Sequence, residues 1–319
     1  MNARAKALMG CRRTILAFER YPTSLCFATI GALAVSAGVA VAANTICAPP
    51  GDQASSALAG YDFRADDVRH IELARPLHEI SGLALDVTDG LFAHHDERAT
   101  VFRLDPADGR ILSSFNLGSR GRTGDFEGIA LAGSRFFLVT SDGRLLESGH
   151  GEDGASVEFD ESRIASRRVC AEIEGLEYDA PGNALLLACK FTQGRALRDR
   201  LVILRFSLRS RTLDAEPFIS LPVESLAPFG LGSTINPSGI AIHPLTGTII
   251  VLAALQRAIV ELDRNGNVLG AAQLRGRYHA QAEGIAISRD GTLIIADEGG
   301  SGSATLTYYP YRPVAAGGQ

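Results

Sequence analysis

The sequence repeats one five-residue pattern five times, as EISGL (79–83), DFEGI (125–129), EIEGL (172–176), NPSGI (236–240) and QAEGI (281–285). Each copy has a polar residue, a spacer, Ser or Glu, Gly, and then Leu or Ile at the start of a strand-like segment. The glycines of successive copies are 46, 47, 64 and 45 residues apart. Because a four-stranded propeller blade takes about 45 residues, the repeat predicts five blades.

The segments between the copies predict the strands of each blade. In the first unit, strands are expected at 82–86, 91–96, 99–105 and 110–117, with turn-forming residues between them. The fifth unit ends one strand short, and the strand expected at 68–73 has no hairpin partner immediately upstream. Pairing this strand into the last blade closes the ring and removes an exposed edge. We therefore expect an all-β, five-bladed β-propeller with four-stranded antiparallel blades, rather than an open β-sandwich.

The N-terminal region predicts export. Residues 1–23 carry five basic side chains against one acidic one, and the 20 residues 24–43 carry no charge. Such a segment can span a bilayer as a transmembrane helix, with the basic end in the cytoplasm. A cleaved signal segment ending near Ala40-Val41-Ala42 is the alternative. We expect a linker at 44–60 and the propeller at 61–319, in the periplasm, either tethered to the inner (plasma) membrane through residues 24–43 or released.

Composition and motifs narrow the function. The net charge of −5 gives no support for nucleic-acid binding. The sequence contains no nucleophile elbow, zinc-protease motif or phosphate-binding loop. The longer third step contains two insertions, at 191–199 and 223–236, which we interpret as loops suited to binding. A hairpin turn at 180–182 would bring Cys170 and Cys189 near each other. An oxidising compartment would allow a disulfide between them, and the sequence does not decide whether it forms.

The repeated pattern also predicts rings of polar side chains around the propeller axis. Period-two alternation places the position before each glycine and the position two residues earlier on one side of the strand. The first set is Ser81, Glu127, Glu174, Ser238 and Glu283, and the second is Glu79, Asp125, Glu172, Asn236 and Gln281. All ten side chains carry oxygen, and facing carboxylates repel unless they take up protons or bind a cation.

This donor set favours Ca²⁺, which takes six to eight oxygen ligands, and disfavours zinc because it contains no His or Cys. A water-filled polar channel is the alternative, and a bound ion could be structural or catalytic. The candidate metal ligands are Glu127, Glu174, Glu283, Ser81, Ser238, Glu79, Asp125 and Glu172.

A further ring is expected at the end of the second strand of each blade. Its positions are Asp96, Ser141, Cys189, Ala253 and Asp297, followed by Glu97, Asp142, Lys190, Ala254 and Glu298. The ring is acidic in blades one, two and five and apolar in blade four, and such an asymmetric patch suits a ligand. His94 and His95 adjoin it, but alternation lets at most one of them face the channel. A hydrogen-bonding role is the simpler interpretation of this pair.

The five patterns, with HEISGLALD (78–86) and QAEGIAISRDGTLIIADE (281–298) the most extended, resemble the SdiA-regulated (YjiK-like) family of exported bacterial propellers. The resemblance covers residues 71–311. It implies a five-bladed propeller, distantly similar to NHL-repeat proteins, with bound calcium, and Glu127, Glu174 and Glu283 are the positions to which that ion would be assigned first. The family has no settled activity.

Two functions follow from these observations. The first is a membrane-tethered, calcium-binding periplasmic module that binds a ligand or a protein at the cell envelope. The second is a metal-dependent hydrolase of phosphoesters or lactones, since the chain more distantly resembles phytase-like and lactonase-like propellers. The hydrolase would need a general base beside the ion, such as Asp96, Asp297 or Glu298.

Overall fold

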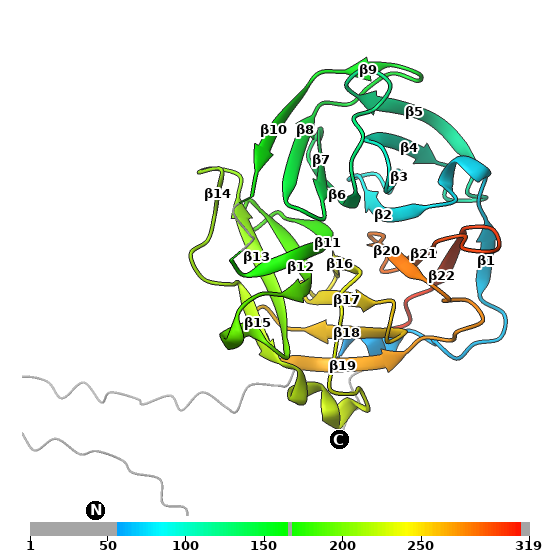
Figure 1. Ribbon diagram of the computed structural model, residues 1–319. Coiled ribbons are helices and arrows are strands. Elements are labelled where there is room, and N and C mark those ends of the chain that lie inside the picture. Colours follow the sequence, from blue (N-terminus) through cyan, green and yellow to red (C-terminus); the bar gives the residue numbers. More distant parts are fainter. Residues whose placement is uncertain (1–55, 165–167, 314–319) are drawn as a thin grey trace, which may run out of the picture. The chain divides into compact units, whose positions relative to one another are not determined.

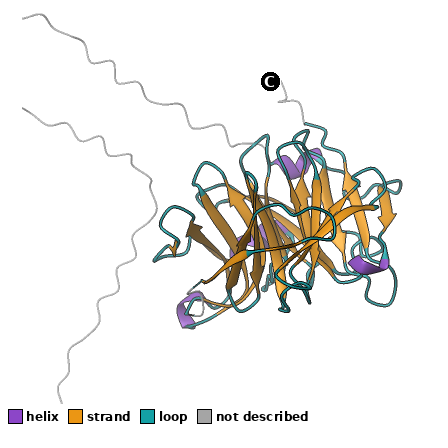
Figure 2. Cartoon of the chain, turned by 90° about the horizontal axis from the view of Figure 1, so that it is seen from above, coloured by secondary structure: helices purple, strands orange, loops and turns teal. Residues whose placement is uncertain are grey.

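Five antiparallel sheets surround a central axis in the computed structural model, which describes residues 56–164 and 168–313 (Figure 1). Seen from above, strands form the body of the propeller, with loops at its faces (Figure 2). Blade 1 contains β2 (Ile80–Leu85), β3 (Leu91–His95), β4 (Thr100–Leu104) and β5 (Ile111–Leu117). Blade 2 contains β6 (Phe126–Ala132), β7 (Arg135–Thr140), β8 (Arg144–Ser148) and β10 (Phe159–Arg163).

The remaining blades follow in chain order. Blade 3 contains β11 (Cys170–Asp179), β12 (Ala184–Thr192), β13 (Arg200–Ser207), β14 (Thr212–Leu213) and β15 (Ile219–Pro222). Blade 4 contains β16 (Gly239–Ile242), β17 (Ile249–Ala253), β18 (Ala258–Leu262) and β19 (Val268–Gln273). Blade 5 contains β20 (Ala282–Ile287), β21 (Leu293–Asp297), β22 (Thr305–Tyr309) and β1 (Arg69–Glu72).

The N-terminal strand closes the ring, as the strand count predicts. Strand β1 pairs antiparallel with β22, with Ile71 opposite Leu306. The first strands of the five blades contact one another in sequence, and β20 contacts β2. Closure leaves no blade without a neighbour on either side, and the five-bladed prediction is confirmed.

Two blades differ in detail from the expectation. The segment 156–163 divides between two blades. Its first part, β9 (Ser156–Val157), pairs parallel with β5 of blade 1, and β10 stays in blade 2. Asp153 accepts a hydrogen bond from the Ser114 amide at 2.9 Å, which holds the preceding loop against β5. In blade 3, both β14 and β15 pair with β13, so two short strands share the outer position of this blade.

The hydrophobic core consists of five clusters, each shared by two adjacent blades. Between blades 3 and 4, for example, Leu186 and Leu201 pack with Val251 and Val260. Four of the five spacer residues of the repeated pattern also belong to these clusters; they are Ile80, Phe126, Ile173 and Ala282. Since the spacers face the space between blades, the polar residues on either side of them face the axis.

The described part of the chain begins before the first strand. A short helical turn, η1 (Ala57–Gly60), lies at the end of the predicted linker 44–60. The buried Glu261 carboxylate accepts hydrogen bonds from the Ala57 and Leu58 amides at 3.0 and 3.1 Å. The predicted membrane segment 24–43 lies outside the described residues. Within those residues, none of the helices is long and apolar enough to cross a membrane.

Candidate functional site

The residue before the glycine occupies a shift in strand register. In β2, Ile80 is opposite His95 and Gly82 is opposite His94, so Ser81 has no partner of its own. The same shift occurs at Glu127 in β6 and at Glu283 in β20. Strand β11 also changes register, between Ile173 and Leu176. An extra residue of this kind bends the strand and redirects its side chain, which here is the polar residue of the repeat.

The five first strands enclose a small axial cavity of about 10 Å³. Its polar lining consists of Ser81, Glu127 and Glu283, together with the glycine of every copy of the pattern. A Cβ atom on Gly128 would lie 2.7 Å from the Leu176 amide nitrogen, and one on Gly239 would lie 2.8 Å from the Glu283 carbonyl oxygen. The glycines therefore let neighbouring strands approach closely enough to leave room for about one water or one ion.

Two glutamates that line this cavity, Glu127 and Glu283, each interact with Glu174 of a third blade. Burial, followed by the nearby Glu174 carboxylate, raises the pKa of Glu127 to about 9. The same two causes raise the pKa of Glu283 to about 8. Burial also raises the pKa of Glu174, although Lys190 opposes this shift. Ser81 Oγ donates a hydrogen bond to Glu127 Oε2 at 3.0 Å. The axis therefore concentrates negative charge that only a proton or a cation can neutralise.

Lys190, from the end of β12, is the cation that the structure places among these carboxylates. Its Nζ lies 2.9 Å from Oε1 of Glu174, whose exposed fraction is only 5%. Burial lowers the pKa of Lys190, but the hydrogen bond and charge of Glu174, followed by the charges of Glu283 and Glu127, raise it above its usual value. The repeat places Lys190 in the ring at the ends of the second strands. It does not predict this contact, because alternation gives the side of a strand that a residue faces and not the reach of its side chain.

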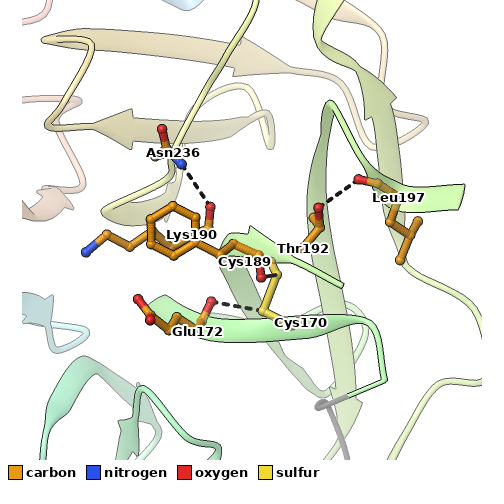
Figure 3. Close-up of a disulfide and its surroundings, with 8 residues drawn as sticks. Cys170, Glu172, Cys189, Lys190, Thr192, Leu197 and Asn236 are labelled. Atoms are coloured by element: carbon orange, nitrogen blue, oxygen red, sulfur yellow. Dashed lines mark hydrogen bonds between the residues drawn. A yellow bond between two sulfur atoms is a disulfide. The ribbon is translucent and has the colours of Figure 1, made fainter. Parts of the chain in front are cut away.

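A disulfide fixes the strand from which Lys190 extends. Cys170 of β11 and Cys189 of β12 are bonded, with their Cα atoms 5.6 Å apart. Figure 3 shows the side chains of Lys190 and Glu172 on the same side of this strand pair, and the Asn236 amide donates a hydrogen bond to the Lys190 carbonyl at 3.2 Å. The bond that the sequence left open is therefore formed, next to the axial site.

The other predicted ligands divide into two groups. Ser238 Oγ donates to the Ala282 carbonyl at 2.7 Å and accepts from the Ala254 amide at 3.0 Å, so its hydroxyl serves the packing of blades 4 and 5. Glu79 and Asp125 are exposed and Glu172 is half-buried. Asp125 also accepts a hydrogen bond from Ser141 Oγ. The charge of Asp125 raises the pKa of Glu127, so the outer polar positions still act on the axial cavity.

The ring at the ends of the second strands forms an acidic patch between blades 5 and 1. Burial and the charges of Asp96 and Glu79 raise the pKa of Glu298 to about 7. The pKa of Asp96 is also raised, mainly by burial and then by the charge of Glu79. Its neighbour His95 is half-buried, whereas His94 is fully buried behind Gly82, whose Cβ would lie 2.4 Å from His94 Nε2. The expectation that at most one of the two histidines reaches the channel agrees with this arrangement.

A buried group of hydrogen-bonded side chains behind the patch is not predicted by the sequence. His279 Nδ1 lies 2.8 Å from Asp297 Oδ2, and His279 Nε2 lies 2.7 Å from the Tyr309 hydroxyl. The other Asp297 oxygen accepts a hydrogen bond from the Gln281 amide at 3.1 Å. His279 lies outside the repeated pattern, so its spacing carries no signal. With both oxygens engaged, Asp297 supports the fold of blade 5.

The donor chemistry of the axis fits a hard cation. Glu127, Glu283 and Ser81 supply oxygen only. The raised pKa values of the two half-buried carboxyl groups show that their ionised forms lack sufficient compensating positive charge, which a bound cation would supply. In the arrangement of the described ranges 56–164 and 168–313, no group of three or more His, Cys, Asp or Glu side chains is already placed to hold a metal ion. Glu174 is instead paired with Lys190.

Comparison with known proteins finds one family model that matches part of the chain and several solved structures with a similar fold. Residues 231–303 match the family model described as SdiA-regulated. No curated protein matches the sequence. Among solved structures, glutaminyl cyclase from Myxococcus xanthus is similar, with a TM-score of 0.51 and 14% identity over 77% of this chain and 96% of that chain. The PQQ-bound aldose sugar dehydrogenase from Streptomyces coelicolor has a TM-score of 0.49 and 13% identity, over 77% and 99% of the two chains. At these identities the likeness to the cyclase shows the fold alone.

Proposed function

We propose that this β-propeller of the SdiA-regulated family is a binding module that holds a Ca²⁺ ion on its axis and recognises a ligand or protein at the cell envelope. The observation that carries the ion is the set of three interacting carboxylates, Glu127, Glu174 and Glu283, with Lys190 as the one opposing ammonium group. Glu127 and Glu283 are its first ligands, with Ser81 beside them and Glu174 shared with Lys190.

The envelope location is supported by two features of the chain. The uncharged segment 24–43 follows a basic region, which suits export with or without cleavage. The Cys170–Cys189 disulfide is of the kind that forms and persists in oxidising compartments such as the periplasm. Both features support a propeller on the outer side of the plasma membrane.

Binding is favoured over hydrolysis by the engagement of two of the three candidate general bases, Asp297 and Glu298, whereas Asp96 Oδ1 accepts no hydrogen bond from the described residues. Asp297 uses both oxygens within blade 5. Glu298, whose pKa of about 7 would suit a base, accepts a hydrogen bond from the Gln281 side-chain amide. A fold shared with enzymes does not itself supply a reaction, so the geometry is better explained by an ion that stabilises a binding scaffold.

Thermal unfolding of the full-length protein tests the ion. Saturating Ca²⁺ binds the folded state and should raise Tm by roughly 5–10 °C over protein treated with EDTA, as expected from about 3 kcal/mol of binding energy. The E127Q/E283Q variant should lose this response, because it removes two first ligands. The matched control, E152Q/E216Q, removes the same charge from two exposed sites and should respond like the wild type. An equal Tm with Ca²⁺ and with EDTA in the wild type would refute the calcium site.

A further inference from the structure

A second cavity, of about 450 Å³, lies between the two insertions of blade 3. One wall comes from residues 190–200, which include η3 (Arg195–Leu197). The other comes from residues 233–236, with Val223 at the start of η4 (Val223–Phe229). Its volume lies within the range of small-molecule sites. The insertions that lengthen the third repeat therefore enclose a space large enough for a ligand.

The charge of this cleft is opposite to that of the axis. Four cationic side chains line it, Lys190, Arg195, Arg198 and Arg200, against the single carboxylate of Asp199. Arg200 donates from Nε to Ser220 Oγ at 2.6 Å, and Lys190 is paired with Glu174. Arg195 and Arg198 are exposed, and neither has a side-chain hydrogen bond or ion pair to any residue in the ranges that the structure describes. In a chain whose net charge is −5, two unpaired guanidinium groups at one cavity favour an anionic ligand.

Hydrogen bonds hold the cleft walls in place. Thr192 Oγ1 donates to the Leu197 carbonyl at 2.8 Å, which fixes the turn that carries Arg195 (Figure 3). The Val223 amide donates to the Asp199 carbonyl at 2.9 Å, and the Asn236 side-chain amide donates to the Lys190 carbonyl at 3.2 Å. These contacts tie both insertions to β12, so a ligand would meet walls that are already positioned.

The cleft also offers apolar surface. Phe191 is 42% exposed although it is a large hydrophobic residue, and it lies in the cavity wall. A neighbouring cavity of about 400 Å³ shares Lys190 and Asn236 with the cleft and includes Leu255, which is 70% exposed. Exposed phenylalanine and leucine beside cationic groups suit a molecule with an apolar body and one charged end.

We propose that the blade 3 cleft binds a small organic anion, with its phosphate or carboxylate group at Arg195 and Arg198 and its apolar body against Phe191. This inference deepens the proposed function by naming the class of ligand. It rests on the role of the propeller as a binding module, and it does not depend on the axial ion.

Titration calorimetry on the full-length protein with phenyl phosphate and with phenylacetate tests the cleft and separates the two anionic groups. At least one probe should bind with a Kd below about 1 mM, and benzylammonium, which has the opposite charge, should not compete. The R195A/R198A variant should weaken binding about tenfold or more, because each lost guanidinium removes a charge-assisted hydrogen bond. Its Tm should stay within about 2 °C of the wild type, since both side chains are exposed.

The R64A/R209A variant removes the same charge from two exposed arginines outside the cleft and should bind like the wild type. The cleft proposal is overturned if neither anion binds with a Kd below about 1 mM, or if R195A/R198A binds as tightly as R64A/R209A. Repeating the titration in EDTA separates the two proposals. If anion binding persists in EDTA while Ca²⁺ fails to change Tm, the proposal of an axial ion is refuted and the proposal of an anion-binding cleft stands.

Discussion

Lys190 is the only lysine that follows Lys6, in a chain that otherwise uses arginine for its positive charge. Its ammonium group is paired with the buried Glu174 and lies near two further carboxylates. Replacing it by Met in the absence of Ca²⁺ leaves Glu174 without its partner and should lower the free energy of unfolding by about 1–3 kcal/mol. The same change removes the charge that repels a metal ion, so Ca²⁺ affinity should rise about tenfold or more. Thermal unfolding and calcium titration measure the two effects.

The control for this variant is Arg110→Met, which breaks an exposed ion pair with Asp105 at 3.2 Å and should change the unfolding free energy by less than about 0.5 kcal/mol. A Lys190→Met protein with weaker Ca²⁺ binding would contradict an ion at the axis. The sequence predicts the polar character of this site, because Glu127, Glu174 and Glu283 recur before glycine. It does not predict the ion pair between Lys190 and Glu174, because this contact depends on a long side chain from another strand.

At the scale of elements, the disulfide joins β11 to β12 beside the axial site. Closing a loop between cysteines 19 residues apart should contribute about 3 kcal/mol to stability by restricting the unfolded chain. The C170S/C189S variant should therefore unfold at a Tm lower by roughly 6 °C or more. A reducing agent should shift the wild type by a similar amount and leave the variant unchanged.

The matched variant C11S/C26S alters two cysteines that are not part of this bond and should keep the wild-type Tm. If C170S/C189S melts with the wild type in oxidising buffer, the bond contributes nothing to stability. Sequence reasoning could predict that the two cysteines approach each other, since both follow from the hairpin 170–192. It could not predict that β9 leaves blade 2 for blade 1, because a two-residue parallel pairing has no periodicity of its own.

For the whole molecule, the five-bladed ring follows from the repeat length and from the strand missing in the fifth unit, which is why the sequence predicts it well. The charge distribution does not follow from the repeat. The axis and the patch between blades 5 and 1 are acidic, whereas the blade 3 cleft is basic. Residues of the cleft come from the insertions, where the repeat stops, so only the folded chain shows that their charges converge on one cavity.

The half-buried carboxyl groups of Glu127 and Glu283 make the stability of the ring depend on pH in a defined direction. The pKa values of Glu127 and Glu283 rise from 4.5 to about 9 and about 8 on folding, so between these limits the native state binds more protons than the unfolded state. Stability is therefore lost as pH rises, and without Ca²⁺ the Tm should fall by roughly 5 °C or more between pH 6 and pH 9. Ca²⁺ binds the ionised carboxylates, so its stabilising effect should grow over the same interval. The E127Q/E283Q variant has no proton to lose at these positions and should show a flatter profile. A wild-type Tm that rises from pH 6 to pH 9 would show instead that these carboxylates are already ionised and neutralised by their protein neighbours.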